Sequence, residues 1–412
     1  MLNVKSRSWG YYLGAIAGLT LAGCSQQAFN LQSANEPLRA TVVSPFDAKA
    51  LGLRNLVSFD VYVDKQAVHA AFVATPVDGK QAYIAYLHSE DGGLHWSAPQ
   101  ALSEQFKQAV ESKAGNDIQI AASGDKRMVM WQTRGELPGM GPLLTVYSDD
   151  AGNTWQLAAN PAGLDGDQSH HDLAADAEGR FHAVWLDDRD ENGYQGVRYA
   201  RSGDTGRHWE LAQTIDDSSC SCCWNRLAIS ANGKIDVLYR DMEFRDMALA
   251  QSADAGATWQ RLGTVGAFNW KFDGCPHNGG GLSYAGDGSL HGVVWTGAEN
   301  STGLYHMQSA DDGKNWMPPQ RIGEGTAGFH ADIAADAGRL VIVWDAMGPE
   351  GSQVYIGESR DNGSSWSDAR LLSSPGASAE FPRIVKTSSG LLAMWSEQRP
   401  GAGKQWLSAV LQ

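Results

Sequence analysis

The chain is poor in positive charge and in cysteine, and it has no long apolar run outside its first 22 residues. Lys and Arg number 32 against 47 Asp and Glu, so the formal net charge is −15. The absence of a basic run argues against nucleic acid as a partner, and the acidity argues against broad docking on anionic lipid. The 412 residues suffice for a large core, and we expect a soluble monomeric domain after the first segment.

The first residues indicate export. Lys5 and Arg7 precede the apolar stretch 11–22, which is shorter than the roughly 20 residues that a membrane-spanning helix needs. Leu21-Ala22-Gly23-Cys24 resembles a bacterial lipobox, which implies cleavage before Cys24 and lipidation of its sulfur. Ser25 then favours the outer membrane. The alternative is an ordinary secretory signal with a chance cysteine. We therefore expect a signal peptide over 1–23, a polar tether over 24–38, a folded domain over 39–412, and a location in the periplasm on a lipid anchor.

One eight-residue pattern, Ser-x-Asp-x-Gly-x-x-Trp, occurs six times. Its copies begin between 50 and 59 residues apart, which is the length of a repeated four-stranded unit and predicts a β-propeller. The Asp residues of the six copies are Asp91, Asp150, Asp204, Asp254, Asp311 and Asp361. We interpret them as structural, because an Asp side chain accepts amide hydrogen bonds within a hairpin turn and the Gly adopts a positive φ. The alternative is a ring of exposed carboxylates that binds calcium or acts in catalysis.

A second repeat sets the number of blades. Seven apolar runs carry an aromatic residue where the second strand of a blade would lie: Phe72, Trp131, Trp185, Tyr239, Trp295, Trp344 and Trp395. The seventh unit lacks the eight-residue pattern and a fourth strand, and the run Ala40–Val43 is suited to supply that strand. We predict an all-β propeller of seven blades closed by an N-terminal strand, with six blades as the alternative.

The repeated pattern resembles the Asp-box, or BNR repeat, of the sialidase superfamily. The resemblance covers nearly the whole mature chain and implies its fold. Active sialidases have six blades, three substrate-binding arginines, a Tyr nucleophile supported by Glu, and an Asp acid/base. Arg54, Arg226 and Arg383 are the arginines near the starts of first strands, and they are widely spread around the ring. The arginine motif of sialidases is absent, since 381–384 scrambles it at the wrong end of the chain. A true sialidase is therefore not expected.

Cysteine and histidine gather before the first strands of neighbouring blades. Cys220, Cys222 and Cys223 precede blade 4, Cys275 and His277 precede blade 5, His170 and His171 precede blade 3, and His330 precedes blade 6. These segments should meet at the face of the ring opposite the Asp boxes. Thiolate and imidazole are the ligands of copper and zinc, so we predict a metal site there. The alternatives are disulfides between the two cysteine segments and hydrogen-bonded structural histidines.

Acidic side chains follow the second strands and should lie on the same face. Asp241 and Glu243 are candidates for a general acid or base, but ion pairing with the neighbouring arginines is the interpretation we favour. Three functions remain open. The first is a periplasmic copper or zinc protein with a redox or metal-transfer partner. The second is a sialidase-like glycoside hydrolase or glycan-binding protein, and the third is a disulfide-braced binding or scaffold module.

Overall fold

The structure is a computed structural model that describes residues 40–79, 81–188, 195–323, 328–348 and 351–412. Residues Arg39–Gln412 form one compact unit. The expected signal peptide, tether and lipidated Cys24 lie outside the described residues. The described part of the chain is all β, and it contains no helix with the length and apolarity to span a membrane.

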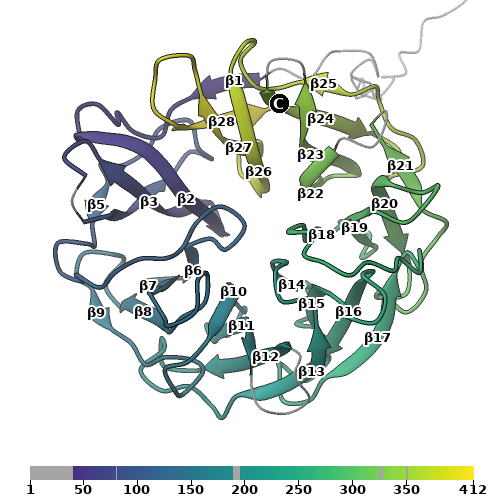
Figure 1. Ribbon diagram of the computed structural model, residues 1–412, viewed down its shortest axis with the longest axis horizontal. Helices are drawn as coiled ribbons and strands as arrows, with labels where there is room; N and C mark the ends of the chain where they lie inside the picture. Colours follow the sequence, from purple (N-terminus) through teal and green to yellow (C-terminus); the bar gives the residue numbers. More distant parts are fainter. Residues whose placement is uncertain (1–39, 80, 189–194, 324–327, 349–350) are drawn as a thin grey trace, which may run out of the picture. The chain divides into compact units, whose positions relative to one another are not determined.

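The strands form seven four-stranded antiparallel sheets, which are the blades of a propeller (Figure 1). Blades 1 to 3 comprise β2 (Leu53–Asp64), β3 (Ala67–Pro76), β4 (Tyr83–Ser89), β5 (Gln100–Ala101); β6 (Gln119–Ser123), β7 (Lys126–Gln132), β8 (Leu143–Ser148), β9 (Gln156–Leu157); β10 (Gln168–Ala175), β11 (Phe181–Asp188), β12 (Gln195–Ser202), β13 (Gln213–Ser219). Blades 4 to 6 comprise β14 (Arg226–Ile229), β15 (Ile235–Arg240), β16 (Met247–Ser252), β17 (Gln260–Val265); β18 (Gly280–Tyr284), β19 (Leu290–Thr296), β20 (Gly303–Ser309), β21 (Gln320–Ile322); β22 (Gly328–Asp336), β23 (Arg339–Gly348), β24 (Gly351–Ser359), β25 (Arg370–Leu371). Blade 7 comprises β26 (Ser378–Thr387), β27 (Gly390–Gln398), β28 (Gln405–Leu411) and β1 (Ala40–Val43).

Blade 7 joins the two ends of the folded unit. β1 pairs antiparallel with β28, with Ala40 opposite Leu411 and Val43 opposite Ser408. Figure 1 shows β1 in purple beside β28 in yellow. The predictions of seven blades and of an N-terminal closing strand are therefore confirmed. The closing strand covers the edge of β28, whose unpaired amides would otherwise be free to pair with another chain.

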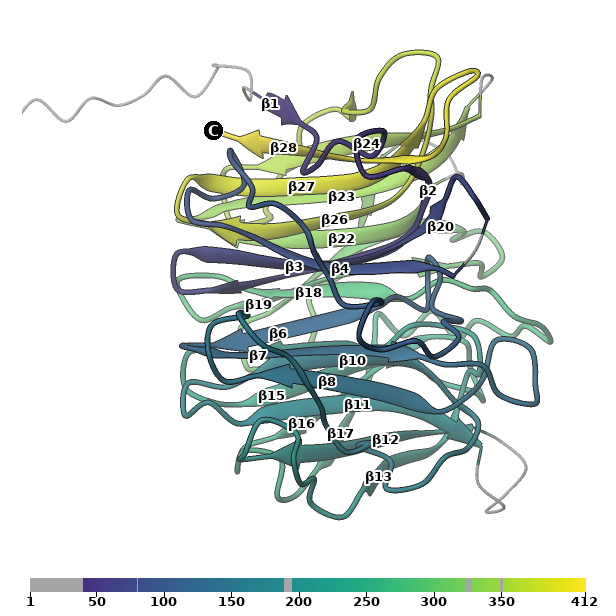
Figure 2. The same cartoon turned by 90° about the vertical axis from the view of Figure 1, so that its left-hand side faces the viewer.

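The aromatic residues of the second repeat all lie on second strands, as predicted. Six of the seven side chains are buried, and Trp295 is partly buried. Figure 2 shows strands from several blades running in similar directions across the thickness of the ring. Because successive strands in a blade are antiparallel, the turn after each first strand and the turn after each third strand fall on one face. The first strands begin on the opposite face, which we call the open face.

Each Asp box begins at the last residue of a third strand and folds into a tight turn. In blade 2, the Ser148 hydroxyl donates to Asp150 and accepts from the Gly152 amide, while the Thr154 amide donates to Asp150 Oδ1. Hydrogen bonds from Thr154 lower the pKa of Asp150 to about 2. The same bonds recur in the other boxes, so local turn bonding accounts for the Asp at this position. The residue before the Gly, such as Ala151, also has a positive φ, which the sequence did not indicate.

Buried carboxylates link adjacent blades beside the ring axis. Asp60 accepts a hydrogen bond from the Ile120 amide, Asp172 accepts from Leu227, and Asp332 accepts from Ile384. In each case a first strand carries the acid and the first strand of the next blade carries the amide. Burial raises the pKa of all three carboxyl groups. The Arg226 guanidinium lies among them, with Nη2 3.7 Å from Asp332 Oδ2, and favours their ionised form.

Removal of the Asp332 carboxylate should strongly destabilise the ring. Asp332→Ala deletes an inter-blade acceptor and leaves Arg226 with less compensation, so we expect a loss of about 3–5 kcal/mol in the free energy of unfolding. Asp332→Asn keeps an acceptor oxygen and should lose less. Urea unfolding measures both, with the exposed Glu243→Ala as a control within about 0.5 kcal/mol of wild type. Wild-type stability of Asp332→Ala would contradict this role.

Histidines on the second strands are buried and bonded across the blade. His69 Nδ1 lies 2.9 Å from the Tyr86 hydroxyl, and His182 Nδ1 lies 2.7 Å from the Tyr199 hydroxyl. His69, His182 and His291 lie on β3, β11 and β19, the second strands of blades 1, 3 and 5. Burial lowers the pKa of His69 to about 3, so this ring stays neutral in the fold at mildly acidic pH.

The folded protein should therefore become less stable at acidic pH, because His69 gains a proton only in the unfolded chain. Below the ordinary histidine pKa near 6.5, the unfolded chain binds a proton that the folded chain does not, so stability falls as the pH falls. Between pH 7 and pH 5, wild type should lose about 2 kcal/mol more than His69→Gln. Urea unfolding of both proteins at the two pH values measures this difference. Parallel pH profiles would show that His69 is not the group responsible.

Candidate metal centre

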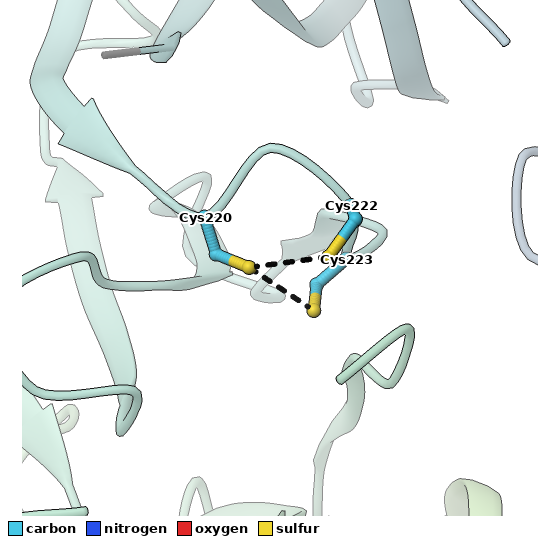
Figure 3. A group of neighbouring side chains, drawn as sticks. All are labelled: Cys220, Cys222 and Cys223. Atoms are coloured by element: carbon cyan, nitrogen blue, oxygen red, sulfur yellow. Dashed lines mark hydrogen bonds between the residues drawn. The ribbon is translucent and has the colours of Figure 1, made fainter. Parts of the chain in front are cut away.

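Three cysteine sulfurs meet in the segment between β13 and β14. The Cys220 amide donates to the Arg240 carbonyl oxygen at 2.9 Å, which anchors the start of this segment to blade 4. Cys220 Sγ lies 3.5 Å from Cys222 Sγ and 3.6 Å from Cys223 Sγ (Figure 3). All three sulfurs lie within 4.8 Å of one another, and all three residues are buried. We call Cys220, Cys222 and Cys223 the inner group.

A second set of ligand atoms shares one of these sulfurs. Cys222 Sγ, Cys275 Sγ and a ring nitrogen of His277 also lie within 4.8 Å of one another. Cys275 and His277 are exposed and belong to the segment between β17 and β18. We call Cys222, Cys275 and His277 the outer group. The four cysteines of the described residues are free, so the alternative of disulfides between the two segments is not found there.

Glycine allows the two segments to approach. The indole of Trp224, which follows Cys223, lies so close to Gly279 that a Cβ there would be 2.4 Å from its Nε1. Trp224 Nε1 donates to the Gly280 carbonyl oxygen at 3.3 Å. Trp224 was not among the predicted site residues, although the run Gly279–Gly281, which begins two residues after His277, indicates close backbone approach.

Two buried arginines of blade 4 bind the segment that carries Cys275 and His277. Arg240 Nε donates to the Asn278 carbonyl at 2.9 Å, and Arg245 Nε donates to the Phe272 carbonyl at 3.0 Å. The positive charge of Arg245 also favours the thiolate form of Cys220, and that of Arg240 favours the thiolate form of Cys223, by lowering the pKa. Hydrogen bonds from the Cys222 and Cys223 thiols, with the charge of Arg245, lower the pKa of Cys220. The hydrogen bond with Cys220 raises the pKa of Cys222, and burial raises that of Cys223. The inner group thus favours one thiolate held by two thiols.

The structure does not bring the other predicted histidines into either group. His330 Nδ1 lies 2.7 Å from Asp345 Oδ2, and its ring stacks on Phe381 with centroids 3.9 Å apart. His171 Nε2 lies 3.3 Å from the Met130 carbonyl oxygen of blade 2. Burial lowers the pKa of His170 to about 3, and the charges of Cys220 and His277 also act on this ring.

His170 and His330 occupy equivalent bulges. Both have a positive φ, at 48° and 43°, where the pairing of the first strand shifts register. Their equivalence was visible in the sequence. Their different partners were not, because His330 meets Asp345 of the paired strand β23 in its own blade and Phe381 of β26 in the next blade.

The arginine and acidic candidates are engaged in ion pairs. Arg383 Nη2 lies 3.0 Å from Asp117 Oδ2, and Arg226 Nη2 lies 3.7 Å from Asp332 Oδ2. Both arginines thus face protein carboxylates, although Nε and Nη2 of Arg226 have no hydrogen-bond partner among the described residues. Asp241 is buried and pairs with Arg261, while Glu243 is exposed. The preferred interpretation of ion pairing holds for Asp241, although its partner is not one of the neighbouring arginines.

Two small hollows lie beside Arg383. One hollow of about 10 Å³ is lined by Trp224, His330 and Phe381 together with Asp117 and Arg383. A second of about 20 Å³ shares Asp117, Phe381 and Arg383. Such volumes hold about one water molecule each, which is far less than a sugar ring needs.

Comparison with known proteins supports the fold. No protein-family model and no curated protein matches the chain. An ulvan lyase of polysaccharide lyase family PL25 has 10% identity and a TM-score of 0.59 over 86% of this chain and 93% of its own. The polysaccharide lyase Uly1 has 12% identity and a TM-score of 0.54 over 85% and 89% of the two chains. NanB sialidase from Streptococcus pneumoniae has 10% identity and a TM-score of 0.48 over 87% and 69%. The seven-bladed propeller of this chain is thus similar in fold to polysaccharide lyase propellers.

Proposed function

We propose that this protein binds a soft transition metal, copper(I) or zinc, through the cysteines and His277 on the open face. The observation that carries the proposal is the pair of ligand groups that meet at Cys222, each with its three ligand atoms within 4.8 Å. A metal at about 2.3 Å from each of several sulfurs in tetrahedral geometry places those sulfurs about 3.8 Å apart. The separations of 3.5 and 3.6 Å from Cys220 Sγ need only small adjustment to meet that requirement.

The chemistry of the ligands selects the metal class. Thiolate sulfur favours copper(I) and zinc over magnesium or calcium, which prefer oxygen ligands. Arg240 and Arg245 offset the negative charge that accumulates when thiols lose their protons to bind a metal. The lipobox resemblance supports placing this site in the bacterial envelope on a lipid anchor. A periplasmic redox or metal-transfer protein is the partner we propose there.

A single substitution tests the metal site, because Cys222 belongs to both groups. Protein purified without chelator should carry close to one copper or zinc per chain, and Cys222→Ser should lower metal affinity by about 100-fold or more. Elemental analysis and competition with a chromophoric chelator measure the two effects. Ser221→Ala, in the same segment, is the matched control and should bind as wild type does. A wild-type protein that takes up neither metal would refute the proposal.

Binding or cleavage of an acidic glycan is a second candidate, and the structures of similar fold favour it more than they favour metal binding. One ulvan lyase structure, with a TM-score of 0.58 and 11% identity, is described as bound to -[GlcA(1-4)Rha3S]-. In this protein the aromatic rings of Trp224 and Phe381 lie beside the Arg383 guanidinium, which is a combination that suits a sugar carboxylate. We place this candidate second because the hollows are small and Arg383 is already paired with Asp117.

Glycan activity would have a clear signature. On this hypothesis the protein releases sialic acid from sialyllactose or shortens a uronate oligosaccharide, and Arg383→Ala lowers the rate by about 100-fold or more. Chromatography of the products measures both reactions, and Lys314→Ala, at an exposed residue in the Asp box of blade 5, serves as control. An absence of product with either substrate, or equal rates for Arg383→Ala and wild type, would leave metal binding as the function to pursue.

A further inference from the structure

We infer that the metal site has two positions, and that a metal is captured by the exposed outer group and then passed through Cys222 to the buried inner group. This inference rests on the proposed metal-binding function and gives it a direction. The relevant juxtaposition is that one sulfur belongs to two ligand sets of opposite exposure.

The outer group is suited to capture. Cys275 and His277 are exposed, so a metal held by a soluble donor can reach their sulfur and nitrogen without any change in the fold. The two residues lie in the segment 266–279, which is outside any strand. Cys222 is the least enclosed inner sulfur, with 7% of its residue surface exposed against 1% for Cys220 and Cys223. A donor therefore meets Cys275, His277 and Cys222 first.

The inner group is suited to retention. Its three soft ligands are buried, and three thiolates bind copper(I) more strongly than two thiolates and an imidazole. Arg240 Nε and Arg245 Nε donate to the backbone carbonyls of Asn278 and Phe272, in the segment that carries the outer ligands. These bonds fix blade 4 to the segment that carries Cys275 and His277.

The transfer is a ligand exchange at constant metal oxidation state. The bond between the metal and Cys222 Sγ persists while bonds to Cys220 Sγ and Cys223 Sγ form. The bonds to Cys275 Sγ and to the His277 nitrogen break. The Cys223 thiol loses its proton as it binds, and the released Cys275 thiolate takes up a proton, so charge and protons balance without any redox partner.

Loading kinetics separate the two positions. The full folded chain is mixed anaerobically with the copper(I)–bicinchoninate complex, and loss of its absorbance is followed by stopped flow. The Cys275→Ser/His277→Ala variant should reach wild-type stoichiometry but load about tenfold or more slowly. Cys223→Ser should load at close to the wild-type rate but lose about 100-fold in affinity at equilibrium. Asp273→Ala and Ser221→Ala are the matched controls in the two segments, and both should behave as wild type.

The outcomes that overturn the inference are distinct. If the Cys275→Ser/His277→Ala variant loads at the wild-type rate, the outer group plays no part in capture. If that variant loses its bound copper at equilibrium, the five residues form a single mixed site. If wild type binds no copper or zinc, the proposed function fails and the two-position inference fails with it. The Cys275→Ser/His277→Ala variant still tests the inference if Cys223→Ser does not fold, because the double variant leaves the buried cysteines unchanged.

Discussion

The hydrogen bond from an amide of one first strand to a carboxylate of the preceding one is the contact on which the ring depends. Asp60, Asp172 and Asp332 each accept such a bond beside the axis. Three buried carboxylates would repel one another without compensation, and Arg226 supplies it from the blade 4 strand. Arg226 lies three residues after Cys223, so the ionic network at the axis also positions the chain directly after the inner group.

The site differs from that expected for a sialidase because its arginines are already engaged. A substrate carboxylate needs cations whose charge is not already offset, whereas Arg226 and Arg383 face protein carboxylates. The distinctive groups of the open face are the cysteine sulfurs, and not charged side chains that could bind a substrate. Trp224, which follows Cys223, packs against Gly279 before blade 5, where a side chain on residue 279 would meet the indole. The protein therefore resembles polysaccharide lyases in fold, while its open face carries cysteine and histidine groups suited to a metal.

The sequence predicted which cysteines and which of the histidines lie together only in part. The partners of His171 and His330 could not be predicted, and for the same reason. Cys220, Cys222, Cys223, Cys275 and His277 were grouped correctly because their places relative to the first strands of adjacent blades set their positions on the ring. His171 and His330 shared that register and still point to other partners. Register determines which face a residue occupies, but the direction of its side chain also depends on neighbours from other blades, such as Met130 beside His171 and Phe381 beside His330.

The sequence by itself determined the repeat, and through it the seven blades, the closing strand and the faces on which turns and first strands lie. These follow from local chemistry, since the Asp box bonds within its own turn and each second strand buries its own aromatic residue. Only the tertiary structure decided that Cys222 serves two ligand groups, that Arg226 offsets three carboxylates, and that Arg383 is paired. Each of these joins residues from different blades, and their separation depends on the closure of the whole ring, which no local pattern records.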